Sequence, residues 1–350
     1  MTSHPTSPFG AMDNSSMDNS SDDECPFMPL NATKTFKIPM YSVIVAFGLP
    51  LNILAFWALI YQLKKSVVLS VYIMNLVVAH LLQILTLPFW MYYSHNNHEW
   101  NLGKEACLLI GVAFRTNFYA KNTFLCLIAM ERYLGLAHPL RFHRAQTVPG
   151  AVKISILVWL VDLTLCAVGV GLQIRTFERG KKSCVDSSIL NRDYANFRVS
   201  IMAFSFVIPL FLMAFFHITV LFKIRQVVSL EKRVKTQMSG FISLLITFFF
   251  LLFTPYQVVS YYRYLLEVRT PSTEVCDSLR AIFVYEHATL CLSLLDNILD
   301  PLFYNLLLKD IQTDFRRCLF SRANRKGLSS EARISSTFRH YENPRQLPDP

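Results

Sequence analysis

The sequence predicts an all-α membrane protein, in which seven membrane-spanning helices form a bundle and a short amphipathic helix follows them. The first observation is composition: 53% of the 350 residues are hydrophobic, more than an ordinary soluble protein carries. The second is that the apolar residues gather in seven runs, each long enough to cross a bilayer as a helix. These runs lie at 38–63, 67–94, 104–138, 150–174, 196–228, 235–266 and 277–307.

The segment before the first run differs in composition from the spans. Residues 1–37 are polar and acidic and contain no apolar signal-peptide core, so we expect an extracellular tail and a first span that acts as the targeting signal. Three N-x-S/T sequons, at Asn14, Asn19 and Asn31, predict glycosylation of this tail. The seven-helix bundle is then expected to occupy residues 38–308.

The segment after the last run predicts a helix on the inner leaflet of the membrane. Residues 309–320 have an amphipathic pattern, and Cys318 within them is a candidate for palmitoylation, with an unmodified buried thiol as the alternative. Residues 321–350 are polar and charged and are expected to form a disordered cytoplasmic tail. The apolar residues that share one face of the amphipathic helix are Ile311, Phe315 and Leu319.

Basic residues between the spans predict the orientation of the chain in the plasma membrane. Lys64, Lys65 and the segment 141–144 fall on the same side as the basic C-terminal tail, which the positive-inside rule places in the cytoplasm. Basic residues around the second outer loop, within 175–198, act against this assignment. Because the formal charge of +10 is distributed between apolar spans, it favours a multi-pass membrane protein and argues against nucleic-acid binding.

The third span ends in two charged residues, Glu131 and Arg132, followed by Tyr133. An acid and a guanidinium at this depth either anchor the helix end or serve a function. Pro255 and Pro301 each remove a backbone hydrogen bond inside a span. Each proline therefore predicts a kink at which a helix can pivot.

In order and spacing, several motifs resemble those of rhodopsin-type G-protein-coupled receptors. The resemblance implies that a heterotrimeric G protein and arrestin bind at the cytoplasmic side. It also implies that Arg132 pairs with Glu131 at rest and turns toward Tyr304 when the sixth helix moves outward. The matching elements are Asn52, Glu131-Arg132-Tyr133, Ala137-His138-Pro139-Leu140, Trp159, Pro209, Phe253-Thr254-Pro255-Tyr256 and Asp300-Pro301-Leu302-Phe303-Tyr304.

Two positions depart from the family pattern, and the chain lacks motifs of enzymes. His217 stands where the family usually has a tyrosine in the fifth helix, and Phe253 stands where it has a tryptophan in the sixth. No HExxH, GxSxG or phosphate-loop motif is present in the sequence. We therefore expect no enzyme activity, no cofactor and no bound metal.

The resemblance also implies a disulfide between Cys107, at the outer end of the third span, and Cys184 in the second outer loop. Cys25 and Cys276 are the remaining outer cysteines, and a bridge between them is expected to tie the N-terminal tail to the seventh helix. The cysteines within the spans, which are expected to be packed thiols, are Cys126, Cys166 and Cys291.

Four titratable residues are expected at the centre of the bundle. Lys121 precedes Arg132 by eleven residues, about three helical turns, so both face the interior. Asp296 and Asp300 are one turn apart on the seventh helix. By the resemblance, His80 replaces an aspartate and Lys121 replaces a serine. We hypothesise that Lys121 takes the place of the sodium ion bound in the family and bridges the two aspartates, with loss of sodium sensitivity; the alternative is that it snorkels elsewhere.

Local sequences resemble most closely the proton-sensing and lysolipid-responsive group of this family, which includes the G2 accumulation receptor. They are FRTNFYAKNTFLC, HNNHEWNLG, FTPYQ and the LSLLDNILDP that follows His287. The resemblance implies activation by extracellular protons, by a lysolipid, or by both. His287 matches a sensing histidine and Asp162 a buried acid. The further candidates for proton sensing are His80, His95, His98 and Glu286.

Two alternatives remain open. The first is a receptor for an anionic lipid or nucleotide without proton sensing, with Arg115, Arg175 and Arg263 on the anion and Phe114 in the apolar wall. The second is a proton-coupled transporter using the central charges, against which the absence of internal repeats argues. The additional residues of the anionic site are Arg198, Phe118, Tyr119, Phe206 and Tyr262.

Overall fold

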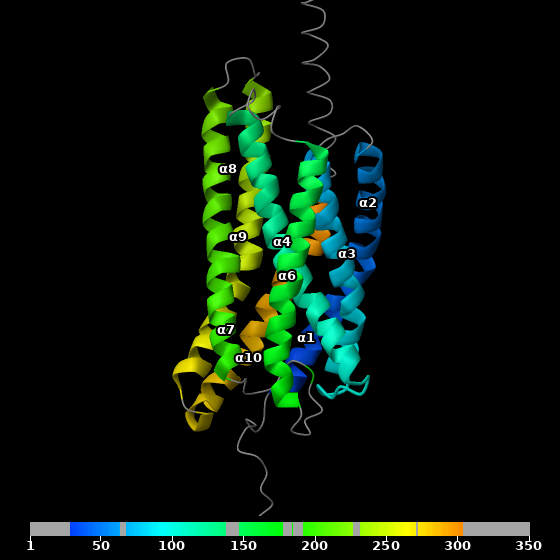
Figure 1. Ribbon diagram of the computed structural model, residues 1–350, viewed down its shortest axis with the longest axis vertical. Coiled ribbons are helices and arrows are strands. Elements are labelled where there is room, and N and C mark those ends of the chain that lie inside the picture. Colours follow the sequence, from blue (N-terminus) through cyan, green and yellow to red (C-terminus); the bar gives the residue numbers. More distant parts are fainter. Residues whose placement is uncertain are drawn as a thin grey trace, which may run out of the picture.

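Seven long helices run side by side along the long axis of the molecule (Figure 1). The computed structural model describes residues 29–63, 68–137, 147–177, 184, 192–226, 232–270 and 272–303. Within these residues every regular element is a helix and there is no strand, which confirms the predicted all-α bundle. The expected amphipathic helix at 309–320, the tail at 321–350 and residues 1–28 lie outside the described residues.

Two of the seven helices contain a π-helical segment. The first helix consists of α1 (Leu30–Val43), η1 (Ile44–Gly48) and α2 (Leu49–Leu63), and the fifth of α7 (Arg192–Met202), η2 (Ala203–Val207) and α8 (Ile208–Gln226). The others are α3 (Val68–His95), α4 (Lys104–Ala137), α6 (Val148–Phe177), α9 (Lys232–Arg269) and α10 (Ser272–Ser293), which a turn connects to the helical residues 296–303.

Both π-helical segments lie directly ahead of a proline. Pro50 follows η1 and Pro209 follows η2, each as the second residue of the next α-helix. Because proline has no backbone N–H, the regular hydrogen-bond ladder cannot continue through it, and a wider turn accommodates the interruption.

Five described helices have the length and hydropathy that membrane crossing requires: Leu30–Ile60, Val68–His95, Val148–Leu172, Arg192–Gln226 and Cys276–Phe303. The third and sixth helices, α4 and α9, have 34 and 38 residues and lie beside the other five. Charged residues lower their hydropathy: Lys121 and Arg132 in α4, and Lys232 and its neighbours at the start of α9. Because Lys121 is fully buried, this charge faces the bundle interior and is compatible with a spanning helix.

The first helix begins at Leu30, inside the segment 1–37 that was expected to be a tail. Its first turns are polar, which hides them from a search for apolar runs. The Lys34 ammonium donates a hydrogen bond to the His95 carbonyl at 2.8 Å, and Lys37 is buried. These contacts hold the additional turns against α3.

The contact of α3, α4 and α6 forms one part of the apolar core. Leu76 and Val77 of α3 and Phe124 of α4 are fully buried. The Trp159 ring of α6 packs on Phe124 at a centroid distance of 5.9 Å, and its indole N–H donates to the Asn75 side-chain oxygen at 2.9 Å. This core positions α4, which carries several of the residues described below.

The packing of α6 on α7 leaves little room for a side chain at Gly169. A Cβ atom there would lie 2.9 Å from Cε1 of Phe197, whereas one at Gly171 would meet nothing within 4 Å. We expect Gly169→Leu to destabilise the protein by about 1–3 kcal/mol, because overpacking displaces side chains and backbone. Gly171→Leu is the matched control. Equal thermal unfolding temperatures of the two purified variants would contradict this prediction.

Candidate functional site

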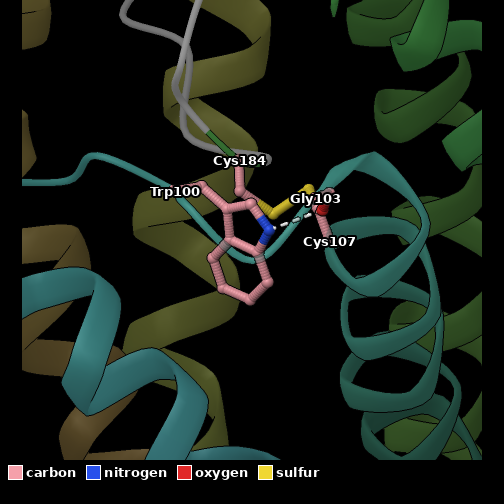
Figure 2. The surroundings of a disulfide bond; sticks show 4 residues. All are labelled: Trp100, Gly103, Cys107 and Cys184. Carbon is pink, nitrogen blue, oxygen red and sulfur yellow. Dashed lines mark hydrogen bonds between the residues drawn. A yellow bond between two sulfur atoms is a disulfide. The ribbon is translucent and has the colours of Figure 1, made fainter.

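A disulfide between Cys107 and Cys184 marks one end of the bundle, which we call the disulfide end (Figure 2). The Cα atoms of the two cysteines are 5.7 Å apart. Beside them the buried Trp100 donates its indole N–H to the Gly103 carbonyl at 2.8 Å. Gly103 has a φ of +87°, which glycine adopts readily, so the chain can turn sharply into α4.

The other cysteines and the sequons are placed only in part. Cys276 is disulfide-bonded, while its expected partner Cys25 lies outside the described residues. Cys126, Cys166 and Cys291 are free thiols within helices. Asn31 is exposed in the first turn of α1. The further predicted sites outside the described residues are Asn14, Asn19, Tyr304 and Cys318.

A group of charged side chains lies at the centre of the bundle. The Lys121 ammonium of α4 is 2.5 Å from Oδ2 of Asp296, and Nε2 of His80 in α3 is 3.8 Å from the same oxygen. Oδ2 of Asp300 lies 3.5 Å from His80 Nε2. We call His80, Lys121, Asp296 and Asp300 the buried charge cluster. Ligand atoms of His80 and the two aspartates lie within 4.8 Å of one another, close enough to hold a metal ion.

The cluster differs in one respect from the bridge hypothesised from the sequence. Lys121 contacts Asp296, but the second acceptor of its ammonium is Oε1 of Gln83, at 2.5 Å. Asp300 lies one helical turn further along and faces His80 instead. Gln83 is three residues from His80 on α3, so its position on the same helix face was the signal that sequence reasoning missed.

Neutral amides connect the cluster to the first helix. The Asn297 side-chain amide donates to Asp296 Oδ1 at 2.7 Å and to Gln83 Oε1 at 3.1 Å. The Asn52 amide of α2 donates to the Asn297 carbonyl at 2.7 Å. Gly48 permits this approach, since a Cβ there would lie 3.2 Å from the same carbonyl oxygen.

The cluster also contacts aromatic side chains next to the proline of α9. The Lys121 ammonium is 5.8 Å from the ring centre of Phe118 and 5.9 Å from that of Phe253. Phe253 is fully buried and precedes Pro255 by two residues. A movement of α9 about Pro255 therefore changes the surroundings of the central cation.

Residues Glu131 to Tyr133 lie near the end of α4 that is opposite the disulfide end. Glu131 is buried, and its charge attracts that of the neighbouring Arg132. The Tyr133 ring packs on Phe215 and Phe216 of α8, with centroid distances of 5.9 and 5.4 Å. The end of α4 that carries Arg132 is thereby held against the fifth helix.

Two of the predicted histidines lie together at the disulfide end. The rings of His98 and His287 have a centroid distance of 6.2 Å, and only 8% and 5% of the two residues are exposed. Phe283 packs on His287 at 4.3 Å, and Tyr93 packs on His98 at 4.8 Å. His95, by contrast, is exposed at the end of α3.

The remaining proton-sensing candidates do not join the two histidines. His80 lies in the buried charge cluster. Glu286 accepts a hydrogen bond from Arg263 Nη1 at 2.5 Å. Asp162 of α6 is 7% exposed, and among the described residues it forms no ion pair with a histidine.

A cavity of about 100 Å³ lies near the disulfide end, with walls from α1, α3, α4, α7, α9 and α10. Of the anion-binding candidates, Phe114, Arg115 and Arg263 line it, as does Arg198. Tyr262 does not, since it is 52% exposed on the outside of α9. The side chain of Arg175, near the end of α6, lies outside the described part of the chain.

A seven-helix bundle with a cavity at one end, a polar network at its centre and an acid-arginine-tyrosine sequence at the other end defines a heptahelical membrane receptor. The chain belongs to the rhodopsin family of seven-transmembrane receptors, whose family model matches residues 51–304. These proteins are receptors that act on G proteins, which confirms that the chain is not an enzyme. The protein is therefore a multi-pass membrane receptor of a family whose members act on G proteins.

Three relatives illustrate the similarity. Human G-protein coupled receptor 68 is 29% identical over 304 residues, covering 84% of this chain and 80% of the relative. The mouse protein named probable G-protein coupled receptor 132 is 30% identical over 280 residues, covering 77% and 70%. Human G-protein coupled receptor 65 is 26% identical over 271 residues, covering 76% of this chain and 80% of the relative.

Proposed function

We propose that this receptor responds to extracellular acidification through His98 and His287. In this proposal the disulfide end and the glycosylated N-terminus face the outside of the plasma membrane, and the Arg132 end faces the cytoplasm, where the G protein and arrestin bind. The observation that carries the proposal is the contact of two buried imidazoles from different elements, 6.2 Å apart between ring centres.

Imidazole side chains change charge between about pH 5 and 8. Two imidazolium ions at this separation repel each other, and their burial among Phe283 and Tyr93 leaves the charge poorly solvated. Lys37 of α1, Arg263 of α9 and Glu286 of α10 line the adjoining cavity, and the carboxylate among them already binds Arg263. Acidification therefore favours an arrangement in which the loop carrying His98 moves away from α10.

The seventh helix connects this pair to the buried charge cluster. His287 lies on α10, which leads through the turn at residues 294 and 295 to Asp296. Asp296 binds Lys121, and Lys121 lies beside Phe253 next to the proline of α9. We propose that a displacement of α10 changes this contact. The cytoplasmic end of α9 can then move outward, as bistable helix packing permits.

Replacing the two histidines tests the proposal. We expect His287→Phe and His98→Phe to reduce the second-messenger response to a change from pH 8 to pH 6, because each removes one of the two charges that repel. His95→Phe is the matched control, since this exposed histidine lies only three residues from His98. A second-messenger response of the wild-type receptor that does not change between pH 8 and pH 6 would contradict the proposal.

The cavity supports a second candidate function, a response to a lysolipid or another anionic ligand. Arg115, Arg198 and Arg263 line it together with aromatic side chains. A lysolipid could act alone or together with protons. Adding a lysolipid at each pH of the same assay separates the two stimuli.

A further inference from the structure

Asn97 and His98, which follow α3, have a backbone conformation that is uncommon for residues with a side chain. Their φ angles are +52° and +63°, in the left-handed region. Among the described residues other than glycine, they are the two with a positive φ. Most residues avoid this region because the Cβ atom approaches the following carbonyl oxygen, whereas asparagine and histidine are enriched there. Such a conformation often marks a functional site.

The two residues form a helix C-cap of the Schellman type. The His98 backbone N–H donates to the Tyr93 carbonyl, five residues earlier, at 3.0 Å. Asn97 takes the left-handed position that glycine usually occupies in this motif. The next residue of the motif commonly packs on the last turn of the helix. Here the His98 ring packs on the Tyr93 ring with a centroid distance of 4.8 Å, so the cap directs His98 back toward the bundle.

This turn buries the imidazole of His98. His98 is 8% exposed, and its ring centre lies 6.2 Å from that of Phe283 and 6.2 Å from that of His287, both on α10. His95, three residues earlier, is exposed. Residues three apart share a helix face, so a longer α3 would leave His98 on the exposed side with His95. The left-handed turn, and not the helix, brings His98 to α10.

A side chain from the first helix supports the same turn. The Lys34 ammonium of α1 donates to the His95 carbonyl at 2.8 Å. This carbonyl belongs to the last turn of α3, where carbonyl groups lack partners within the helix and the helix dipole favours a positive charge. Lys34 therefore stabilises the end of α3 from which the chain turns to His98.

We propose that Asn97 is a positioning residue for the response to acid, because its left-handed conformation holds His98 against His287, and that Lys34 supports this turn from α1. The inference rests on the function proposed above and names the residues that build its histidine pair. A β-branched side chain at position 97 disfavours the left-handed region, so the chain would leave α3 in another direction. His98 would then lose its contacts with Tyr93 and His287 and become exposed.

The first test measures the accessibility of His98 in the full-length receptor in nanodiscs. Diethyl pyrocarbonate acylates the neutral imidazoles that it can reach, and mass spectrometry measures the rate at each histidine. His95 is the internal reference because it is exposed in the same segment. We expect Asn97→Val to raise the rate at His98 relative to that at His95 by about tenfold, because the left-handed conformation is about that much less populated for a β-branched residue.

Two variants of the same turn are the controls. Asn97→Gly keeps the left-handed conformation accessible, so the rate at His98 should stay at the wild-type value. Asn96→Val introduces the same β-branched side chain one residue earlier, where φ is not positive, and should also leave the rate unchanged. A rate at His98 that is the same in Asn97→Val as in the wild type would overturn the proposal.

The second test is the second-messenger response to a change from pH 8 to pH 6. We expect Asn97→Val to reduce this response to the level of His98→Phe, and Asn97→Gly to retain it. Because Asn97 acts through His98, the double variant Asn97→Val, His98→Phe should respond as His98→Phe does. Losses that add in the double variant would show that Asn97 acts through general stability, and would overturn the positioning role.

Lys34 is tested in the same assay. Lys34→Met should reduce the response by less than Asn97→Val, because the hydrogen bond that it removes is exposed to solvent. Lys34→Arg keeps a cationic donor and should retain the response. Equal responses of Lys34→Met and the wild type would overturn the supporting role of Lys34.

The two tests separate this inference from the proton function. If the wild type responds to acid and Asn97→Val changes neither the rate at His98 nor the response, the positioning inference fails and the proton function stands. If Asn97→Val exposes His98 but the wild type does not respond to acid, Asn97 positions His98 and the proton function fails. If Asn97→Val exposes His98 and the response stays at the wild-type value, His98 has no part in the response and both proposals fail.

Discussion

Replacing Lys121 with methionine is expected to destabilise the receptor by about 3–5 kcal/mol, because it removes one partner of a buried ion pair. Methionine nearly fills the same space, so the effect comes from the Asp296 carboxylate, which loses the ammonium at 2.5 Å. The thermal unfolding temperature of the purified receptor measures the effect. The double variant Lys121→Met, Asp296→Asn is expected to recover most of the loss, since it leaves no isolated charge.

An unfolding temperature of Lys121→Met equal to that of the wild type would contradict this prediction.

A second measurement uses the cation of the buffer. We propose that the Lys121 ammonium, 2.5 Å from Asp296 Oδ2, supplies the positive charge that a diffusible cation would otherwise supply beside this carboxylate. Replacing sodium by choline should therefore leave activation of the wild-type receptor unchanged, and a sodium-dependent loss of agonist potency would refute this role.

Replacing Arg263 with methionine is expected to have the second-largest effect, again on the order of 3 kcal/mol. Arg263 is the cation between Glu286 on α10 and Glu267 on α9, at 2.5 and 3.4 Å. Its removal leaves two buried carboxylates without that charge. Glu286→Gln is the matched control and should cost less, because Arg263 then keeps Glu267.

The pH dependence of this effect distinguishes charge from packing. Protonation neutralises the carboxylates that Arg263→Met leaves behind, so the difference in unfolding temperature from the wild type should become smaller at about pH 5 than at pH 7.5. A deficit that is the same at both values would show that Arg263 acts through packing alone.

The seven spans and the family motifs were predictable because a membrane imposes local rules. Backbone polar groups in lipid must be satisfied within each segment, so a spanning segment is a helix and its outer face is apolar. Stretches such as Val68–His95 can therefore be read from composition alone. The sequence placed the start of the first helix at residue 38, although the helix begins at Leu30. Its first turns lie against α3 and not in lipid, so they can be polar, and a search for apolar runs does not find them.

The sequence also identified the charged residues of the bundle as candidate functional residues, because an ionisable side chain within a span is rare. It could not determine how they pair. His95 and His98 are three residues apart, yet one is exposed and the other contacts His287 on a distant helix. Arg198 and Arg263 are the same residue type in one cavity, but only Arg263 has carboxylates at its guanidinium among the described residues.

Composition and periodicity thus determined the membrane topology and the kind of residue at the centre of this receptor, because hydrophobic burial acts through the pattern of each helix by itself. The partners of Lys121, the contact of His98 with His287 and the unbalanced charge of Arg198 depended on the tertiary structure. The physical reason is that Coulombic and hydrogen-bonding interactions act over a few ångströms, and those distances are set by how separate helices rotate and pack against each other.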